Sequence, residues 1–306
     1  MLSYEHIYHA GNHADILKHL TLTLILERLL QKDKPFTLYD THAGFGVYDL
    51  TDVRAKKTNE AESGLRKVLA AAKDLDDKDS DSVAKIMAPY LGLCHTYAEE
   101  EKYPGSPEIA RCLMREKDVL VLSELHPQAI EALRNNMKEP PLTCGQKGQS
   151  GTNYVKPKIH FRNGFEMLTV LTPPSTKRGC AIIDPSFEES ADYSDCADTI
   201  CAVHERWQNG IIALWYPLLE HRASETSRMK QQIISSAQAK QTEENLLDIQ
   251  LAVQSPEEKT GLAKLYGSGM LVVNFPYQLD TQMEILLPWL TKILGNEHAT
   301  WSIEKY

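Results

Sequence analysis

Apolar residues along this chain change their spacing several times, and each change predicts a new helix or strand. Between residues 13 and 31, Ile16, Leu20 and Leu24 recur at helical spacing, and Asn12 is a candidate cap at the start of that helix. Short apolar runs then predict strands, separated in most cases by helical stretches, at residues 36–40, 119–124, 158–161, 180–184, 210–215, 247–253 and 270–275. This alternation predicts an α/β fold with a mostly parallel, doubly wound sheet.

Two segments interrupt the alternation. Residues 53–102 are rich in Ala, Lys, Asp and Glu, and they hold two helical stretches that separate near residues 75–82. We interpret this segment as an inserted helical subdomain, so that residues 1–52 and 103–306 form the main domain. Residues 139–158 carry Gly145, Gly148 and Gly151, a composition that predicts a mobile loop.

The most informative run is residues 180–187, a buried strand that stops at Asp184, Pro185, Ser186 and Phe187. In an open α/β sheet, ligands bind just beyond the carboxyl ends of the strands. One carboxylate, one rigid carbonyl and one aromatic face suit a flat base that carries an exocyclic amine. The run resembles the Asp-Pro-Pro-Tyr signature of methyltransferases that modify the amino group of adenine. An ordinary Asp-Pro turn is the alternative interpretation.

Two further turns are expected at the same edge of the sheet. After the first strand, residues 40–46 run from Asp40 through Gly44 to Gly46. Glycines there permit close approach of a ligand, and their spacing differs from the fingerprint of nicotinamide dinucleotide sites. The turn resembles the first motif of S-adenosylmethionine-dependent methyltransferases, although any strand-to-helix turn can use glycine.

Glu124, after the second strand, either accepts both ribose hydroxyls of a nucleoside cofactor or simply favours the start of a helix. Together, the three strand ends favour a methyltransferase site.

Two other features leave alternatives open. Asn163, after the third strand, either donates to the adenine ring of a cofactor or tolerates a turn.

The N-terminal segment is dense in potential metal ligands, namely His9, His13, Asp15 and His19. Their spacing does not match HExxH, and solvated or helix-capping histidines are a second interpretation. A third places this segment over the cofactor pocket, with Lys18 and His19 facing the ligand.

Composition restricts the class of protein. The 306 residues are 42% hydrophobic and 25% charged, as in ordinary globular proteins, and no run approaches the roughly 18 apolar residues of a membrane span. The first residues lack the pattern of a signal peptide, and the six cysteines form no CxxC pair, so we expect reduced thiols in the cytoplasm. Because the net charge is −9, any nucleic-acid surface must be a local basic patch.

Long runs distributed over nearly the whole chain resemble the ribosomal RNA large subunit methyltransferase J family. They are residues 1–4, 9–15, 17–19, 32–36, 40–44, 103–107, 124–127, 213–217 and 268–270. The resemblance implies a Rossmann-like methyltransferase core with a small helical insertion. It also implies N6-methylation of one adenosine in 23S ribosomal RNA with S-adenosylmethionine. We expect a cytoplasmic monomer without a membrane or protein partner.

The resemblance also implies roles for individual residues. The cofactor contacts carried over from the family are Lys18, His19, His42, Ser106, Glu124, Asn163, Gly164 and Asp184. Asp184 is implied as the catalytic residue, with Pro185 and Phe187 holding the base, and Tyr4 is implied to contact RNA. No metal is expected. Two positions depart from the family pattern, because Ser186 replaces a proline and Asn163 replaces an aspartate.

Three rival functions remain open at this point. A DNA adenine methyltransferase shares the catalytic signature, although no additional domain for reading duplex DNA is evident. A metal-dependent hydrolase would use His9, His13, Asp15 and His19. A non-catalytic RNA-binding module is the third, favoured only by Ser186.

Overall fold

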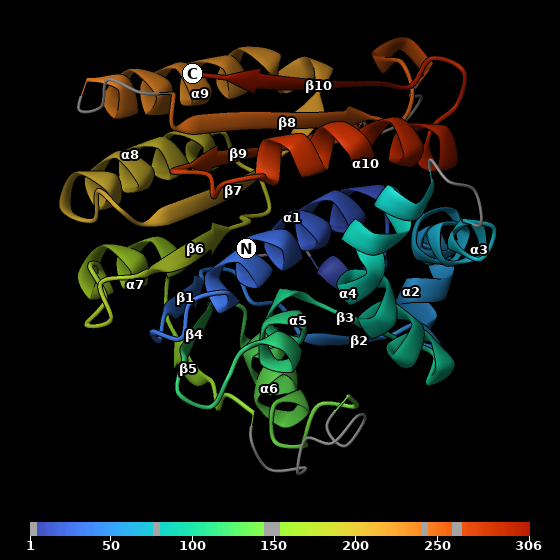
Figure 1. The fold of residues 1–306 in the computed structure, drawn as a ribbon, viewed down its shortest axis with the longest axis horizontal. Coiled ribbons are helices and arrows are strands. Elements are labelled where there is room, and N and C mark those ends of the chain that lie inside the picture. The colour runs from blue at the N-terminus through green and yellow to red at the C-terminus, as the bar shows by residue number, and fades with distance from the viewer. Residues whose placement is uncertain (1–4, 76–79, 144–153, 240–243, 259–264) are drawn as a thin grey trace.

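The computed structural model describes residues 5–75, 80–143, 154–239, 244–258 and 265–306. Within these residues one sheet contains eight strands in the order β10-β8-β9-β7-β6-β1-β4-β5 (Figure 1). The strands are β1 (Thr37–Asp40), β4 (Val119–Glu124), β5 (Lys158–Phe161), β6 (Gly179–Ile183), β7 (Ile211–Leu219), β8 (Leu246–Ala252), β9 (Leu265–Val273) and β10 (Thr300–Lys305). Neighbours from β5 to β7 pair in parallel, whereas β9, β8 and β10 extend the sheet by antiparallel pairing. The predicted α/β class with a mostly parallel sheet is therefore confirmed.

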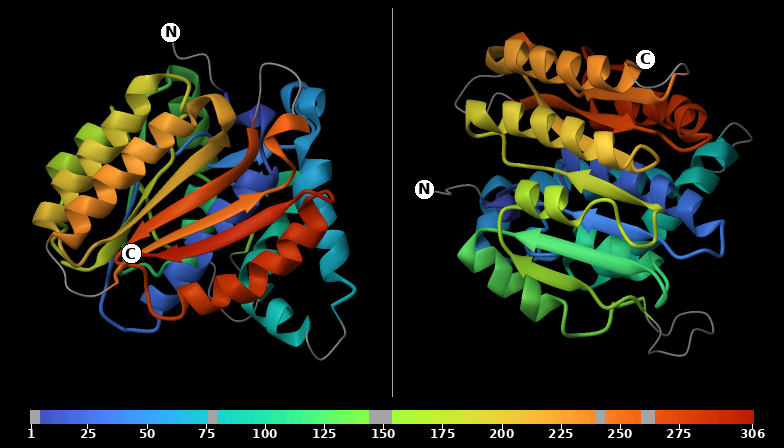
Figure 2. Two further views of the ribbon diagram at one scale, coloured as in Figure 1. Left: turned by 90° about the horizontal axis from the view of Figure 1, so that it is seen from above. Right: turned by 90° about the vertical axis from the view of Figure 1, so that its left-hand side faces the viewer.

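Helices cover both faces of the sheet, as doubly wound folds require. Figure 2 shows α8 and α9 on one face, and α1 with α10 on the other. The helices of the main domain are α1 (His13–Leu30), α5 (Ser106–Leu113), α6 (Pro127–Asn136), α7 (Gly164–Leu171), α8 (Ser190–Arg206), α9 (Ala223–Gln238) and α10 (Leu279–Leu294), with the short turns η1 (His6–Tyr8), η3 (Glu220–Arg222) and η4 (Pro256–Glu258). Each face has its own buried apolar cluster. Within the described residues, no helix is both long and apolar enough to cross a membrane.

The described part of the predicted insertion is mostly helical. Its helical elements are α2 (Val53–Thr58), the π-helical turn η2 (Glu62–Arg66), α3 (Lys67–Ala72) and α4 (Ser80–Glu99). Two short strands that the sequence analysis missed, β2 (Val47–Asp49) and β3 (Lys102–Pro104), pair antiparallel at its base. Leu65, Met87 and Tyr90 belong to the same buried cluster as Leu17 of α1. The insertion therefore packs against the main domain, and its boundaries at residues 53 and 102 stay a prediction.

Strand register brings the chemically important ends together. Asp40, the last residue of β1, pairs with Leu122 on one side and with Ile182 on the other. Glu124 is the last residue of β4 and Asp184 directly follows β6, so both lie at the same edge of the sheet, on the strands that flank β1. The predicted loop at residues 139–158 falls partly outside the described residues, since 144–153 are not described.

Candidate active site

A cavity of about 230 Å³ lies at this edge of the sheet. All eight residues that the resemblance implied as cofactor contacts line it, namely Lys18, His19, His42, Ser106, Glu124, Asn163, Gly164 and Asp184. Pro185 and Ser186 line it as well, whereas Phe187 is not among the lining residues. Tyr4 lies outside the described residues, but Glu5 and His6, which follow it, line the cavity.

Glu124 is fixed by the backbone around it. Its Oε2 accepts the N–H of Gly44 at 2.8 Å, and its Oε1 accepts those of Leu125 and His126 at 2.8 and 2.7 Å. Gly44 adopts φ +58°, a conformation that favours glycine, and this turns its N–H toward the carboxylate. A carboxylate offers about four lone-pair positions, so one remains for a hydroxyl of a ribose. The Glu124 carboxylate therefore fits a nucleoside cofactor.

Asp40 lies beneath the glycine turn and has a different environment. Its Oδ2 accepts the Ser106 hydroxyl at 2.7 Å, and its Oδ1 accepts the His42 N–H at 3.3 Å. Burial raises the pKa of Asp40 to about 7. Burial also lowers the pKa of His42 to about 4, so this imidazole is neutral at pH 7. Ser106 and His42 therefore present neutral polar groups to the cavity.

Asn163 and Gly164 begin helix α7. The Oδ1 of Asn163 accepts the N–H groups of Phe165 and Glu166 at 2.8 and 3.2 Å, which makes it the N-cap. A Cβ atom on Gly164 would lie 2.0 Å from the carbonyl oxygen of Thr41, so only glycine lets α7 approach the turn after β1 this closely. Because the side-chain oxygen of Asn163 is occupied, its amide N–H₂ is the group left for a ligand. The capping role agrees with the turn interpretation, and the adenine contact stays a prediction.

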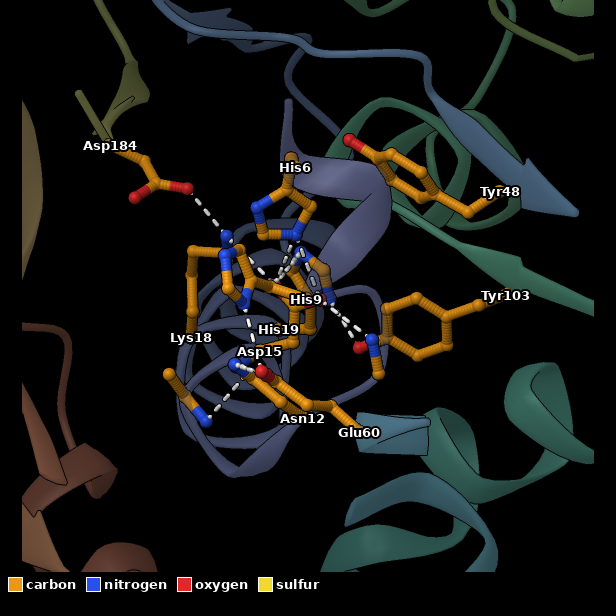
Figure 3. Close-up of polar contacts among 12 residues, drawn as sticks. His6, His9, Asn12, Asp15, Lys18, His19, Tyr48, Glu60, Tyr103 and Asp184 are labelled. Carbon is orange, nitrogen blue, oxygen red and sulfur yellow. Dashed lines mark hydrogen bonds and ion pairs between the residues drawn. The ribbon is translucent and has the colours of Figure 1, made fainter. Parts of the chain in front are cut away.

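Lys18 connects α1 to the strand end that carries Asp184 (Figure 3). Its ammonium pairs with Oδ2 of Asp184 and lies 2.9 Å from Oδ1 of Asp15. Burial opposes the charge of Lys18, but the two carboxylates raise its pKa well above the usual value. His19 lies beside it with a pKa lowered to about 3 by burial, and it shares a 2.6 Å hydrogen bond with the Tyr103 hydroxyl. Lys18 is therefore a fixed positive charge against the candidate catalytic acid.

Phe187 lies differently from what the signature suggested. Its backbone has φ +53°, which is unusual for an aromatic residue, and its side chain is buried. The ring lies 4.7 Å from that of Tyr193 and 6.0 Å from that of Trp215, measured between centroids. Phe187 therefore packs beneath the turn that carries Asp184, and stacking on a base stays a prediction.

The N-terminal histidines have partners other than a metal. His9 contacts the Glu60 carboxylate at 3.0 Å, and His6 donates to Asp15 at 2.9 Å. In the part of the chain that the structure describes, no group of three or more His, Cys, Asp or Glu side chains is arranged to hold a metal ion. The hydrolase alternative has no support in this geometry. The contact between Asp15 and Lys18 was not predicted, although a spacing of three residues on a helix suggests one.

The fold and this cavity define a class of protein. A glycine turn after β1, an acid after β4 and an Asp-Pro turn after β6, placed around one cavity of a mostly parallel sheet, are the features of a Rossmann-like methyltransferase. The chain belongs to the family described as Ribosomal RNA large subunit methyltransferase D, RlmJ, whose model matches residues 33–305.

Individual relatives are similar over nearly their whole length. The chain is 35% identical over 308 residues to Ribosomal RNA large subunit methyltransferase J of Escherichia coli K12, covering 99% of this chain and 98% of that protein. It is also 35% identical over 305 residues to the protein of the same name from Haemophilus influenzae, with the same coverage. A crystal structure of a Legionella pneumophila protein superposes with a TM-score of 0.78 at 27% identity, covering 97% of this chain and 98% of that one.

Proposed function

We propose that this protein transfers a methyl group from S-adenosylmethionine to N6 of one adenosine in 23S ribosomal RNA. The observation that carries the proposal is the position of Asp184 and Pro185, which face the same cavity as the fixed carboxylate of Glu124. The names of the two relatives, both large-subunit ribosomal RNA methyltransferases, support RNA as the substrate. The DNA methyltransferase, hydrolase and binding-module alternatives have no support from the family.

Different residues around the cavity bind different parts of the cofactor. Glu124 accepts a ribose hydroxyl with its remaining lone pair, and the amide of Asn163 is available to the adenine ring. His19, His42, Ser106 and Gly164 line the remaining wall. When bound, S-adenosylmethionine supplies an electrophilic methyl group on a positively charged sulfur.

Asp184 and Pro185 act on the substrate amine, which is a poor nucleophile because its lone pair is delocalised into the adenine ring. Lys18 occupies Oδ2 of Asp184, so Oδ1 remains to accept one N–H of the amine. The carbonyl of Pro185 accepts the other N–H. These two acceptors localise the lone pair on nitrogen and stabilise the positive charge that develops there. Phe187 supports the turn in its buried position, and it would have to leave Tyr193 to stack on the base.

The RNA surface is proposed to lie around the N-terminal segment and the helical insertion. In the sequence, Tyr4 directly precedes Glu5 and His6, which line the cavity, and this adjacency supports the proposal that Tyr4 contacts RNA. On the insertion, α2 carries Lys56 and Lys57, and the Lys57 ammonium lies 5.9 Å from the centroid of the Tyr8 ring. These cations lie on a helix that packs against η1, and they suit contacts to phosphate.

A methyl-transfer assay with several substrates tests the proposal. Tritiated S-adenosylmethionine is supplied with unmodified 23S RNA, with 16S RNA or with duplex DNA. We expect label in 23S RNA, at a single adenosine, and only background in the other two. Preferential labelling of DNA, or binding of RNA with no transfer at all, would instead support one of the rejected functions.

A further inference from the structure

Asp15 is at the centre of the polar contacts behind the active site, yet it does not line the cavity. Its side chain is fully buried. It accepts hydrogen bonds from His6 Nε2 at 2.9 Å and from the Gly11 N–H at 2.9 Å, and it lies 2.9 Å from the Lys18 ammonium. Figure 3 shows His6 and Lys18 beside Asp15. Any effect of Asp15 on the reaction must therefore act through the residues that it contacts.

The contact with Lys18 restricts a side chain that is otherwise flexible. A lysine ends in a compact charge on a four-carbon chain, so its position depends on its partners. Asp15 precedes Lys18 by three residues on α1, and the two side chains share one face of the helix. With Asp15 on one side, the ammonium pairs with Oδ2 of Asp184 on the other.

The remaining contacts of Asp15 hold the N-terminal segment. His6 and Gly11 lie on either side of the turn that leads from η1 into α1. The same segment is fastened to the insertion, because Glu60 contacts His9 at 3.0 Å and accepts the Asn12 amide at 2.9 Å. One buried carboxylate therefore joins the segment that leads to Tyr4 with the pair formed by Lys18 and Asp184.

We propose that Asp15 is a positioning residue for methyl transfer. It holds Lys18 against Oδ2 of Asp184, which leaves Oδ1 open to the substrate amine, and it anchors the N-terminal segment beside the cavity. This inference rests on the proposed function. The prior requirement is that the wild-type protein methylates 23S RNA. If it does not, the proposed function fails, whereas an active wild type lets the Asp15 variants test this inference alone.

The first test compares Asp15→Asn with a matched control. Asp248 of β8 is also a fully buried carboxylate, which pairs with Lys230 and accepts the Tyr216 hydroxyl, and it does not line the cavity. Both substitutions remove a buried charge from a lysine, so both should lower the thermal midpoint. Only Asp15→Asn should also lower kcat, by about 10²-fold, as expected when a catalytic group is misplaced. Equal losses of kcat in the two variants would mean that Asp15 is merely structural.

Two further variants separate position from stability. Asp15→Glu keeps the charge but moves the carboxylate by one methylene, so its kcat should still fall by about tenfold or more. In a Lys18→Met background, the part of the Asp15→Asn loss that acts through Lys18 should disappear, so the double variant should lose much less than the product of the two single losses. A wild-type kcat in Asp15→Glu, or multiplicative losses in the double variant, would overturn the proposal.

Discussion

At the scale of single residues, Asp40, Glu124 and Asp184 lie at the ends of neighbouring strands but have different surroundings. Burial favours the neutral form of Asp40, three backbone N–H groups hold the carboxylate of Glu124, and Lys18 holds one oxygen of Asp184. Three carboxyl groups at one edge of the sheet therefore differ in protonation and in the groups that hold them, according to their surroundings.

Glu124→Ala should weaken the binding of S-adenosylmethionine. The substitution removes the acceptor for the ribose and also leaves the Gly44 N–H without its partner. We expect a loss of about 1.5–3 kcal/mol in binding free energy, the usual value for a hydrogen bond to a charged group. Isothermal titration calorimetry measures this change, and an unchanged dissociation constant would remove Glu124 from the cofactor site.

Asp40 should make stability depend on pH. Its pKa of about 7 in the folded protein lies above the value near 4 of the unfolded chain, so the folded state binds the extra proton between these pH values. The wild type should therefore lose stability relative to Asp40→Asn as pH rises from about 4 to about 7, and no further above that. Denaturant unfolding at several pH values tests this. Parallel stability curves for the two proteins would contradict the assignment.

The sequence predicted much of the site at this scale, but not all of it. The carried-over contacts converge on one cavity because parallel strands place their carboxyl ends together. The buried position of Phe187 could not be predicted, since a positive φ in an aromatic residue depends on its surroundings. The role of Asp15 depends on how the N-terminal segment packs, which helical spacing does not specify.

At the scale of elements, the strands that flank the site were predicted well and the distal ones less well. The first and last residues of β1, β4, β5 and β6 differ from the predicted ones by at most one position. Their apolar runs stop at polar turns, so the strand ends could be predicted. Strand β9 begins earlier than predicted, since Gly267 and Gly269 break its apolar run. The ring of Tyr216, from the neighbouring strand β7, occupies the space into which a side chain at residue 269 would extend. Strand β10 was missed because it is an exposed edge strand with few apolar residues.

The start of α7 should tolerate no side chain at residue 164. Gly164→Ala places a methyl group 2.0 Å from the Thr41 carbonyl oxygen, so α7 must shift away from the turn after β1. We expect a loss of about 1–3 kcal/mol in unfolding free energy, together with weaker cofactor binding. Gly92 of α4 is the control, because a Cβ atom there meets nothing within 4 Å. Gly92→Ala should stabilise the protein by about 0.5–1 kcal/mol. Similar unfolding curves for the two variants would contradict the close approach at Gly164.

At the scale of the whole molecule, a net charge of −9 must be reconciled with an RNA substrate. Local cations can bind phosphate even on an acidic protein. Such binding weakens as the salt concentration rises, because salt ions compete for the phosphates. We therefore expect RNA affinity to fall steeply with salt. Lys57→Ala should reduce the slope of log affinity against log salt by about 1, whereas Lys292→Ala, on α10, should leave it unchanged. An unchanged slope in Lys57→Ala would place the phosphate contacts elsewhere, and an affinity that does not vary with salt would contradict phosphate contacts altogether.

The most direct test of the central claim is the identity of the methylated nucleoside and its dependence on Asp184. Unmodified 23S RNA is incubated with tritiated S-adenosylmethionine and either the wild type or Asp184→Ala, and the RNA is digested to nucleosides. We expect all label in N6-methyladenosine from the wild type and a fall in rate of about 10²–10³-fold in the variant, with its fold intact. Label in another nucleoside, or a variant that keeps half the wild-type turnover, would contradict it.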